Sequence, residues 1–577
     1  MANGKIKLEL TWIGKENRPK LEPRILLEDR EKSHHAPHRF TEHDIFDNRL
    51  IFGDNLLALK ALEQEFANQI KCIYIDPPYN TGSAFAEYED GLEHSLWLSM
   101  MSTRIELLHK LLSKSGSLWI QLDDNESHYC KAMLDEIFGR PQFIANVIWN
   151  KSYAVRSNAD FFSTSHEHLL VYCKDRASFR IKGFSRTAEH EARFKNPDND
   201  PRGPWQSVAF TISLVGGARG RQFAKTGQSE NIYEVTSPSG KTFLPPPNRC
   251  WARSPGGFES LNRDQRLYWG ADGDRAPRLK MFLSESKDEV LPTTLWADGE
   301  IFGFNQDGVR EVRELDLGET FSTPKPERLI EKVIHVSTDP GDLVLDSFLG
   351  SGTTAAVAHK MKRRWIGVEV GRQALTLCAP RLRKVIDGLD EGGITKSQGW
   401  TGGGGFRFYT LAPSLLEKDQ FGNWIINKKY NGAMLTEAMC KLEGFIYAPS
   451  DTYYWQHGHS TESDFIYVTT QTLTRDQIAK LSDEVGSSRS LLVCCSAFRT
   501  KKLDEFPNLT VRKIPKAVLS KCEWGHDDYS LEIKNLPVAP AVEQAAAPSV
   551  EVAPVVKVLR GSRKVKDEPS LFATEGK

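Results

Sequence analysis

Apolar residues follow two different spacings in two separate stretches of the chain, 46–150 and 320–400. Short apolar runs such as 72–75 and 343–345 end at turn residues, which is typical of buried strands in a parallel sheet. Between such runs, apolar residues return every three or four positions, as they do over 97–112, and this spacing predicts helices. Strands that alternate with helices of this length predict an α/β fold with a doubly wound, mostly parallel sheet.

The pattern changes outside these two stretches. Helical periodicity largely disappears in the middle of the chain, where Gly, Pro and aromatic residues dominate, and it returns after a run of glycines near position 400. These changes predict six segments: a polar N-terminal arm (1–45), the first half of the sheet (46–150), an insertion (151–319), the second half of the sheet (320–400), a small C-terminal α/β domain (401–536) and a disordered tail rich in Ala, Pro, Val and Lys (537–577).

Composition limits the class of protein. At 577 residues the chain is too long for one hydrophobic core, and 40% hydrophobic and 26% charged residues are ordinary for a soluble globular protein. No apolar run reaches the roughly 18 residues that a membrane span needs, and the first residues lack the apolar core of a signal peptide. We therefore expect a cytoplasmic protein that does not enter a membrane.

Cysteine and histidine positions give little sign of a metal. The nine cysteines are scattered without a C-x-x-C pair, which argues for reduced thiols and against a zinc site or a disulfide framework. A histidine-rich stretch within the N-terminal arm has no cysteine or spaced carboxylates beside it, so a solvated arm is the better interpretation. His166 and His168 alternate on an expected strand, but no third ligand is visible, and we expect a structural role and no metal site.

The net charge of −1 gives no general sign of a nucleic-acid partner, but one segment has a local excess of positive charge. Residues 201–280 contain 12 Lys or Arg and 6 Asp or Glu, a net of +6, interleaved with aromatic residues. Basic side chains that bind phosphates and rings that stack on bases are what a nucleic-acid-reading insertion needs. A loop-rich domain with solvated charges has the same composition, and this segment alone favours that simpler interpretation.

Asp76-Pro77-Pro78-Tyr79 directly follows the apolar run 72–75. The two prolines stop the strand because neither supplies an N–H to a sheet ladder. A carboxylate and an aromatic ring are therefore expected at the carboxyl end of a strand, where open α/β sheets bind their ligands. Taken alone, the tetrapeptide would be interpreted as a turn with an incidental aspartate.

A second stretch changes that interpretation. The turn with Phe348, Gly350, Gly352 and Thr353 lies between a predicted strand and a predicted helix, and its glycines allow the backbone to approach a ligand closely. Glu369 ends the next strand, 17 residues after Gly352, where a carboxylate can accept hydrogen bonds from ribose hydroxyls. A third glycine and a phosphate-binding lysine are missing, which favours a nucleoside without a pyrophosphate, such as S-adenosylmethionine.

Several motifs in one order carry a family resemblance. The chain resembles amino-group (N6-adenine or N4-cytosine) DNA methyltransferases whose catalytic motif precedes their cofactor motif, the beta-class order, and most closely the modification (Mod) subunit of type III restriction systems. The resemblance covers 46–175 and 320–390. It rests on Gly53-Asp54-Asn55-Leu56, Ile73–Gly82, Trp97–Met101, Asp123–Glu126, His166-Glu167-His168, Lys325-Pro326-Glu327 and Asp346–Thr354.

The resemblance implies a Rossmann-like methyltransferase sheet and transfer of a methyl group from S-adenosylmethionine to the exocyclic amine of a base in double-stranded DNA. Asp76 and the Pro77 carbonyl would accept the two amine hydrogens, and Pro78 would help to hold that carbonyl in place. Tyr79 would stack on the base after its extrusion from the duplex. An Asp at the head of this motif resembles adenine methylases more than cytosine-N4 methylases.

The resemblance also implies the cofactor contacts. Phe348, Gly350 and Gly352, with Thr353 beside them, would surround the methionine moiety, while Glu369 would bind the ribose. Lys325 would lie near the cofactor carboxylate, and Asp346, Asp54 and Asn55 are weaker candidates. Asp54 or Asn55 can equally serve only as the cap of a helix.

Other functions stay open at this point. The same fold could methylate the amine of cytosine, RNA or a protein amide. The chain could also act chiefly as a DNA-recognition subunit that directs a partner nuclease, because it carries no Walker-type phosphate loop or nuclease motif of its own. Within the resemblance, a separate restriction (helicase-nuclease) subunit and a homodimer are the expected partners. The resemblance implies that the insertion at 151–319 is the target-recognition segment, but the DNA recognition sequence does not follow from a loop-rich insertion.

Overall fold

The computed structural model describes residues 9–79, 90–153, 161–215, 223, 226–318, 321–518, 520–527 and 529. The expected disordered tail and the Asn80-Thr81-Gly82 end of the catalytic motif lie outside these residues. Among the residues described, no helix has both the length and the apolar character needed to cross a membrane.

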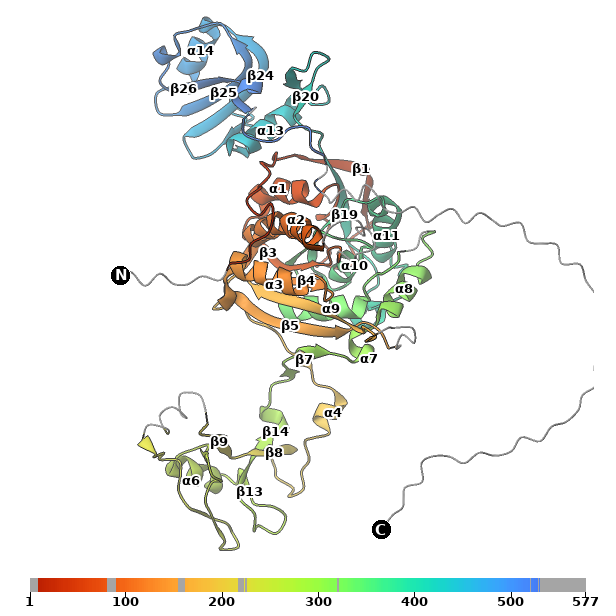
Figure 1. Cartoon of the computed structure of the whole chain (residues 1–577), viewed down its shortest axis with the longest axis vertical. Coiled ribbons are helices and arrows are strands. Elements are labelled where there is room, and N and C mark those ends of the chain that lie inside the picture. The colour runs from red at the N-terminus through yellow and green to blue at the C-terminus, as the bar shows by residue number, and fades with distance from the viewer. Residues whose placement is uncertain are drawn as a thin grey trace, which may run out of the picture. The chain divides into compact units, whose positions relative to one another are not determined.

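A ten-stranded sheet with strands from residues 26–411 is the central element of the fold (Figure 1). The strand order is β1 (Leu26–His35), β19 (Gly405–Leu411), β2 (Asn48–Phe52), β18 (Arg364–Glu369), β17 (Leu343–Asp346), β3 (Ile70–Ile75), β4 (Leu112–Leu122), β6 (His166–Cys173), β5 (Phe143–Asn150) and β16 (Leu295–Trp296). All neighbours from β19 to β4 are parallel. The predicted mostly parallel sheet is therefore confirmed, with antiparallel pairs toward both edges.

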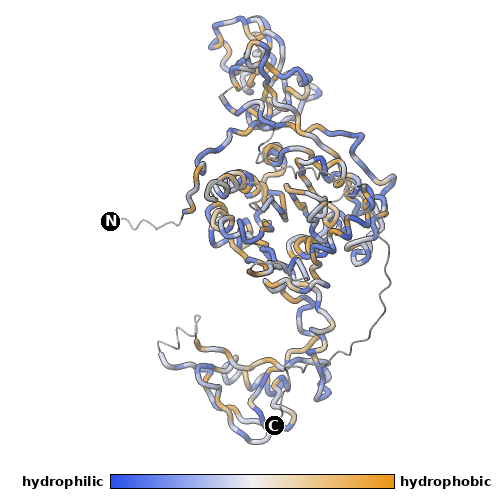
Figure 2. The backbone as a smooth tube through the Cα atoms, turned by 45° about the vertical axis from the view of Figure 1, so that its right-hand side comes forward, coloured by the Kyte–Doolittle hydropathy of each residue, from blue (hydrophilic) through white to orange (hydrophobic). Residues whose placement is uncertain are grey.

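Helices cover both faces of this sheet. Along β3, Cys72 and Tyr74 join one hydrophobic cluster, and Ile73 and Ile75 join another, because successive side chains of a strand point to opposite faces. The first cluster includes α9 (Glu327–Ser337), α10 (Thr353–Lys360) and α11 (Ala379–Ile386), and the second includes α1 (Asn55–Phe66), α2 (Asp90–Leu111) and α3 (Ser127–Leu134). In Figure 2 hydrophobic segments, in orange, run through this doubly wound body.

The two halves of the sheet meet at β3 and β17. Val344 pairs with Cys72 and Leu345 with Ile73, although the strands are far apart in the sequence. This pairing shows that Asp76-Pro77-Pro78-Tyr79 and the glycine turn follow adjacent strands. Parallel strands end at the same edge, so both motifs are brought to one rim.

The N-terminal arm differs from the expectation. Leu26–His35 forms β1, which pairs antiparallel with β19 at the edge of the sheet, with Leu26 opposite Leu411. The segment looked like a solvated arm because an edge strand tolerates charged residues, which also discourage pairing with other chains.

The segment expected as an insertion contains both sheet strands and a separate cluster. β6 and β16 belong to the ten-stranded sheet, and α7 (Gly299–Phe302) and α8 (Asn305–Glu314) follow β16. β7 (Phe184–Ser185) pairs with β15 (Glu289–Val290), so the ends of the segment between them lie together. That segment holds α4 (Ala188–Glu191), β8 (Trp205–Ala209), β9 (Thr211–Ser213), β10 (Val235–Thr236), β11 (Thr242–Phe243), β12 (Arg249–Trp251), α6 (Pro255–Arg263), β13 (Leu267–Tyr268) and β14 (Arg278–Phe282). Its aromatic residues, such as Trp251 and Trp269, form its own small core.

The C-terminal segment has the expected α/β character. Its five-stranded sheet has the order β22 (Ile446–Tyr447), β23 (Gly458–His459), β24 (Asp464–Leu473), β25 (Ser490–Phe498) and β26 (Leu509–Lys513). Helices α13 (Gly432–Glu443), α14 (Arg475–Val485) and α15 (Ile514–Val518) accompany it.

Candidate active site

The site is built at the carboxyl ends of β3 and β17. β3 ends at Ile75 because Pro77 and Pro78 cannot continue the ladder of backbone hydrogen bonds. Asp76 is the first residue after the strand. The turn that presents Asp76 is anchored from a neighbouring helix, since the indole nitrogen of Trp97 donates a hydrogen bond of 2.7 Å to the Pro78 carbonyl.

Both oxygens of the Asp76 carboxylate have partners. The Tyr79 hydroxyl lies 2.6 Å from Asp76 Oδ1, and the Lys325 ammonium lies 2.9 Å from Oδ2. Lys325 also donates to the Tyr79 hydroxyl over 3.0 Å and lies over the Tyr79 ring. Asp76, Tyr79 and Lys325, which lies nearly 250 residues further along the sequence, thus form one hydrogen-bonded group. The predicted contact of Lys325 with a cofactor carboxylate stays a prediction.

Glu167, at the start of β6, completes this group and was missing from the predicted catalytic residues. Its Oε2 lies 3.0 Å from the Tyr79 hydroxyl and 3.5 Å from the Lys325 ammonium, and it accepts a 2.6 Å hydrogen bond from Gln121. Lys151 pairs with Oε1 at 3.2 Å. The signal in the sequence was an acid within an otherwise apolar strand, flanked by His166 and His168.

Burial and charge oppose each other in this group. Burial raises the pKa of Asp76, and the Glu167 charge adds to that rise, while the Lys325 ammonium opposes it without cancelling it. Burial alone would lower the pKa of Lys325, but the two carboxylates outweigh it and the pKa is raised. Asp76 is therefore a carboxylate with an increased affinity for a proton, beside a lysine that keeps its charge.

The glycine turn adopts the backbone that its sequence predicts. Gly350 and Gly352 have φ of +55° and +81°, a left-handed region that favours glycine, and Gly352 begins α10 as its N-cap. The Gly350 N–H donates to Glu369 Oε2 over 2.7 Å, and the Gly371 N–H donates to Oε1 over 2.8 Å. Glu369 therefore supports the turn as well as lying at the predicted position.

Asp346 ends β17 below this turn. Its Oδ1 accepts the Phe348 N–H over 2.9 Å, and burial raises the pKa of its carboxyl to about 7. The neighbouring Ser347 hydroxyl is buried and lacks a hydrogen-bond partner among the residues that the structure describes. Thr353 is held by Arg381, which donates to its hydroxyl over 2.9 Å.

Asp54 and Asn55 have structural partners. Asp54 caps α1 by accepting the Leu57 N–H over 3.0 Å, as the capping alternative predicted. Asn55 donates to the Ser347 carbonyl over 2.8 Å and accepts from Arg104 over 2.5 Å, which joins α1 to the strand end below the glycine turn. A direct role of either residue in cofactor binding stays a prediction.

Comparisons with known proteins agree with this geometry. A family model described as DNA methylase matches residues 70–379. The type III restriction-modification enzyme StyLTI Mod subunit of Salmonella typhimurium is 31% identical over 384 residues, which cover 61% of this chain and 54% of that protein. The probable type III restriction-modification enzyme HindVI Mod subunit of Haemophilus influenzae is 31% identical over 414 residues, with coverage of 64% and 54%. The chain thus spans about half the length of these relatives.

A solved structure is similar at a lower level. The PvuII DNA methyltransferase, described as cytosine-N4-specific, aligns with 60% of this chain and 90% of its own at 14% identity, with a TM-score of 0.33. The family match covers 310 of 577 residues (379 − 70 + 1), including Asp76, Lys325 and the glycine turn. On that match, the chain belongs to the DNA methylase family.

Proposed function

We propose that the protein is a site-specific DNA methyltransferase that transfers the methyl group of S-adenosylmethionine to the N6 amine of a flipped-out adenine. The observation that carries the proposal is the placing of Asp76 beside the glycine turn, at the ends of neighbouring strands. The relatives named as Mod subunits support a role in a bacterial restriction-modification or related phage-defence system, in the cytoplasm.

Asp76 and Pro77 would prepare the amine for reaction. The amino lone pair of adenine is delocalised into the ring, so the nitrogen is a poor nucleophile. Hydrogen bonds from its two hydrogens to the Asp76 carboxylate and the Pro77 carbonyl favour a pyramidal nitrogen whose lone pair faces the methyl group. The bound cofactor supplies an electrophilic methyl on a positively charged sulfur, which becomes a neutral thioether when the N–C bond forms and the C–S bond breaks. The raised pKa of Asp76 suits it to take up the proton that the methylated amine releases.

The base amine would take the place that the Tyr79 hydroxyl occupies on Asp76. With that hydroxyl displaced, Tyr79 would turn its ring to stack on the extruded base. Lys325 and Glu167 would act as positioning residues, because Lys325 contacts the Asp76 carboxylate and Glu167 contacts Lys325 and Tyr79.

The residues around the glycine turn fit the cofactor. The unpartnered Ser347 hydroxyl offers a buried polar atom beside the turn. A Cβ at Gly350 would lie 3.2 Å from the Phe321 ring, so the glycine keeps the turn open. Phe348, Gly350 and Gly352 would hold the methionine moiety and Glu369 the ribose, with Asp346 and Thr353 at its margin.

The decisive experiment compares Asp76→Ala with the unmodified enzyme. Transfer of labelled methyl groups to DNA should disappear, while cofactor binding measured by calorimetry should stay within a few-fold. Asp47→Ala, which removes an exposed partner of Arg364, is the matched control and should keep full activity. Methyl transfer by Asp76→Ala at the normal rate would refute the proposal.

Two finer alternatives have direct tests. Mass analysis of the nucleosides from methylated DNA distinguishes N6-methyladenine from N4-methylcytosine.

The Mod relatives also support a second candidate function, in which the chain mainly recognises DNA for a separate helicase-nuclease subunit, with the segment between β7 and β15 reading the target. Sedimentation of the chain alone would test the proposed homodimer. Added DNA and a co-expressed partner subunit would test the larger assembly.

A further inference from the structure

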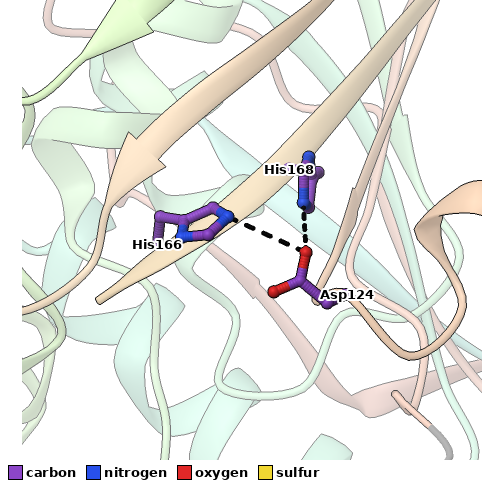
Figure 3. A group of neighbouring side chains, drawn as sticks. All are labelled: Asp124, His166 and His168. Atoms are coloured by element: carbon purple, nitrogen blue, oxygen red, sulfur yellow. Dashed lines mark hydrogen bonds and ion pairs between the residues drawn. The ribbon is translucent and has the colours of Figure 1, made fainter. Parts of the chain in front are cut away.

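Three side chains with metal-binding atoms converge beside the active site. Asp124 lies just beyond the end of β4, and His166 and His168 lie on β6, its antiparallel neighbour, where His168 pairs with Leu122. Figure 3 shows the two imidazoles and the carboxylate pointing toward one another. One ligand atom from each residue lies within 4.8 Å of the other two. The third ligand that the sequence alone did not reveal is therefore Asp124.

The spacing suits a single ion. His168 Nε2 lies 2.8 Å and His166 Nε2 3.8 Å from the same oxygen, Asp124 Oδ1. Ligands at the usual zinc distances of about 2.0–2.2 Å are about 3.4 Å apart at a tetrahedral centre. The two distances to Asp124 Oδ1 bracket that value, and the two imidazole nitrogens lie within 4.8 Å of each other, so side-chain rotations would place all three atoms around one ion.

The outer partner of His168 matches what metal-bound histidines use. The Asn146 amide contacts His168 Nδ1, its nitrogen at 3.0 Å and its oxygen at 3.3 Å. The amide nitrogen is the nearer atom, so the metal-binding tautomer needs the Asn146 amide turned over. Its oxygen then accepts the Nδ1 proton, and the lone pair of Nε2 points toward Asp124.

A simple hydrogen bond explains only part of the cluster. It accounts for His168 and Asp124, but the 3.8 Å from His166 is too long for one, and the described part of the chain offers the His166 ring no shorter polar contact. Two imidazoles and one carboxylate are a ligand set typical of zinc and related ions. Asp124 has a side chain that is 55% exposed, which leaves room for water at a fourth position.

We infer that Asp124, His166 and His168 form a binding site for one divalent transition-metal ion of the Zn²⁺ type. The ion would join the end of β4 to the start of β6. Because successive side chains on a strand point to opposite faces, Glu167 faces the catalytic group while the two histidines face the ion. The ion would be structural, fixing the strand that positions Glu167 without contacting the reacting atoms.

Calorimetric titration of the full chain with Zn²⁺, after removal of metal by a chelator, tests the site. We expect one ion per chain with a rise in melting temperature, and an affinity at least about 100-fold lower in His168→Ala. Asp124→Asn changes an exposed side chain and so tests the site without disturbing the core. Asn146→Ala should weaken binding by about 10- to 100-fold, as loss of an outer-shell partner does.

His38→Ala is the matched control, because His38 is an exposed histidine in the histidine-rich N-terminal stretch. It should bind Zn²⁺ like the unmodified chain. Co²⁺ should give the visible absorption of a low-coordinate site, and Asp124→Asn should remove it. Failure of the unmodified chain to bind one equivalent, or binding that Asp124→Asn and His168→Ala leave unchanged, would overturn the inference.

Discussion

Lys325 lies where two roles can be separated. The sequence placed it near the cofactor, whereas the structure pairs its ammonium with Asp76 at 2.9 Å and with Glu167 at 3.5 Å. A cation beside the Asp76 carboxylate favours the ionised form, which would accept the amine in the proposed mechanism. A cation at the cofactor carboxylate would instead contribute to binding.

Lys325→Gln should therefore lower kcat by about 100-fold, in the range found when one preorganised charge partner is removed. Cofactor affinity, measured by calorimetry, should change by less than a few-fold. Lys151→Gln is the control, because Lys151 contacts the Glu167 carboxylate and not that of Asp76. It should lower kcat by less than Lys325→Gln does. The double variant Lys325→Gln/Glu167→Gln restores charge balance if the single variant unfolds. A large loss of cofactor affinity with unchanged kcat would favour the sequence-based assignment.

Asp346 should make stability depend on pH. Burial raises its pKa from 3.8 to about 7, so between these values the folded protein holds a proton that the unfolded chain releases. Stability therefore falls as pH rises through this window. The slope of about 1.36 kcal/mol per pH unit fades near pH 7, where the folded protein also loses the proton, so the loss from pH 5 to pH 8 amounts to about 2.6 kcal/mol.

Asp346→Asn removes this charge but keeps an acceptor for the Phe348 N–H. Urea unfolding without cofactor should show that the variant gains on the unmodified protein as pH rises from 5 to 8. Asp339→Asn is the control, since Lys182 holds the pKa of Asp339 below its usual value and no such gain is expected. Parallel pH profiles for Asp346→Asn and the unmodified protein would contradict the prediction.

At the scale of elements, one buried carboxylate joins three helices. Glu327 begins α9 and accepts hydrogen bonds from Lys360 on α10 at 2.7 Å, from Arg381 on α11 at 2.9 Å and from the Ile394 N–H at 3.0 Å. Burial alone would raise the pKa of Glu327, but the charges of Lys360 and Arg381 outweigh burial, so the net pKa is lowered. Because Arg381 also holds Thr353, this cluster links the helix packing to the glycine turn.

Glu327→Ala should lower the free energy of unfolding by about 3–5 kcal/mol, because it leaves two buried cations without their shared partner. Asp47→Ala breaks an exposed pair with Arg364 and should cost less than about 1 kcal/mol. Urea denaturation of both variants measures the difference. Equal losses would mean that the buried cluster does not hold the helices together.

Local patterns explain which elements could be predicted. β3 and β17 are short apolar runs that can be recognised locally, and the two motifs that follow them are recognisable from their residue types. β1 is polar because it lies at an edge, and β16 has only two residues, so neither carries a readable pattern. Glu167 was missed for another reason: its partners come from four separate parts of the chain, and no local spacing predicts that they meet.

At the scale of the whole molecule, β7 and β15 make the intervening segment removable. Ser185 pairs with Glu289, so residues 186–288 begin and end at neighbouring positions. Replacement of these 103 residues (288 − 186 + 1) by Asn-Gly would close a two-residue hairpin.

The shortened chain should fold and bind S-adenosylmethionine, because neither β3 nor β17 contacts the deleted part through its ladder. Methylation at the specific sites should be lost, which single-molecule sequencing of DNA from expressing cells would show. The same deletion with the two linker residues in reverse order, Gly-Asn, is the control for the effect of the turn sequence. Methylation of the original sites by the shortened chain would mean that other residues read the target.

The pairing of β3 with β17 also has a consequence for synthesis. Cys72 meets Val344, which follows 272 residues later (344 − 72), so at about 5–20 residues per second the partner strand arrives roughly 15–55 s after β3. During that interval one edge of β3 is open, and its apolar side chains are exposed to other nascent chains. A polypeptide cut between 175 and 320 keeps this open edge permanently and should aggregate, unless the second half is supplied in the same cell.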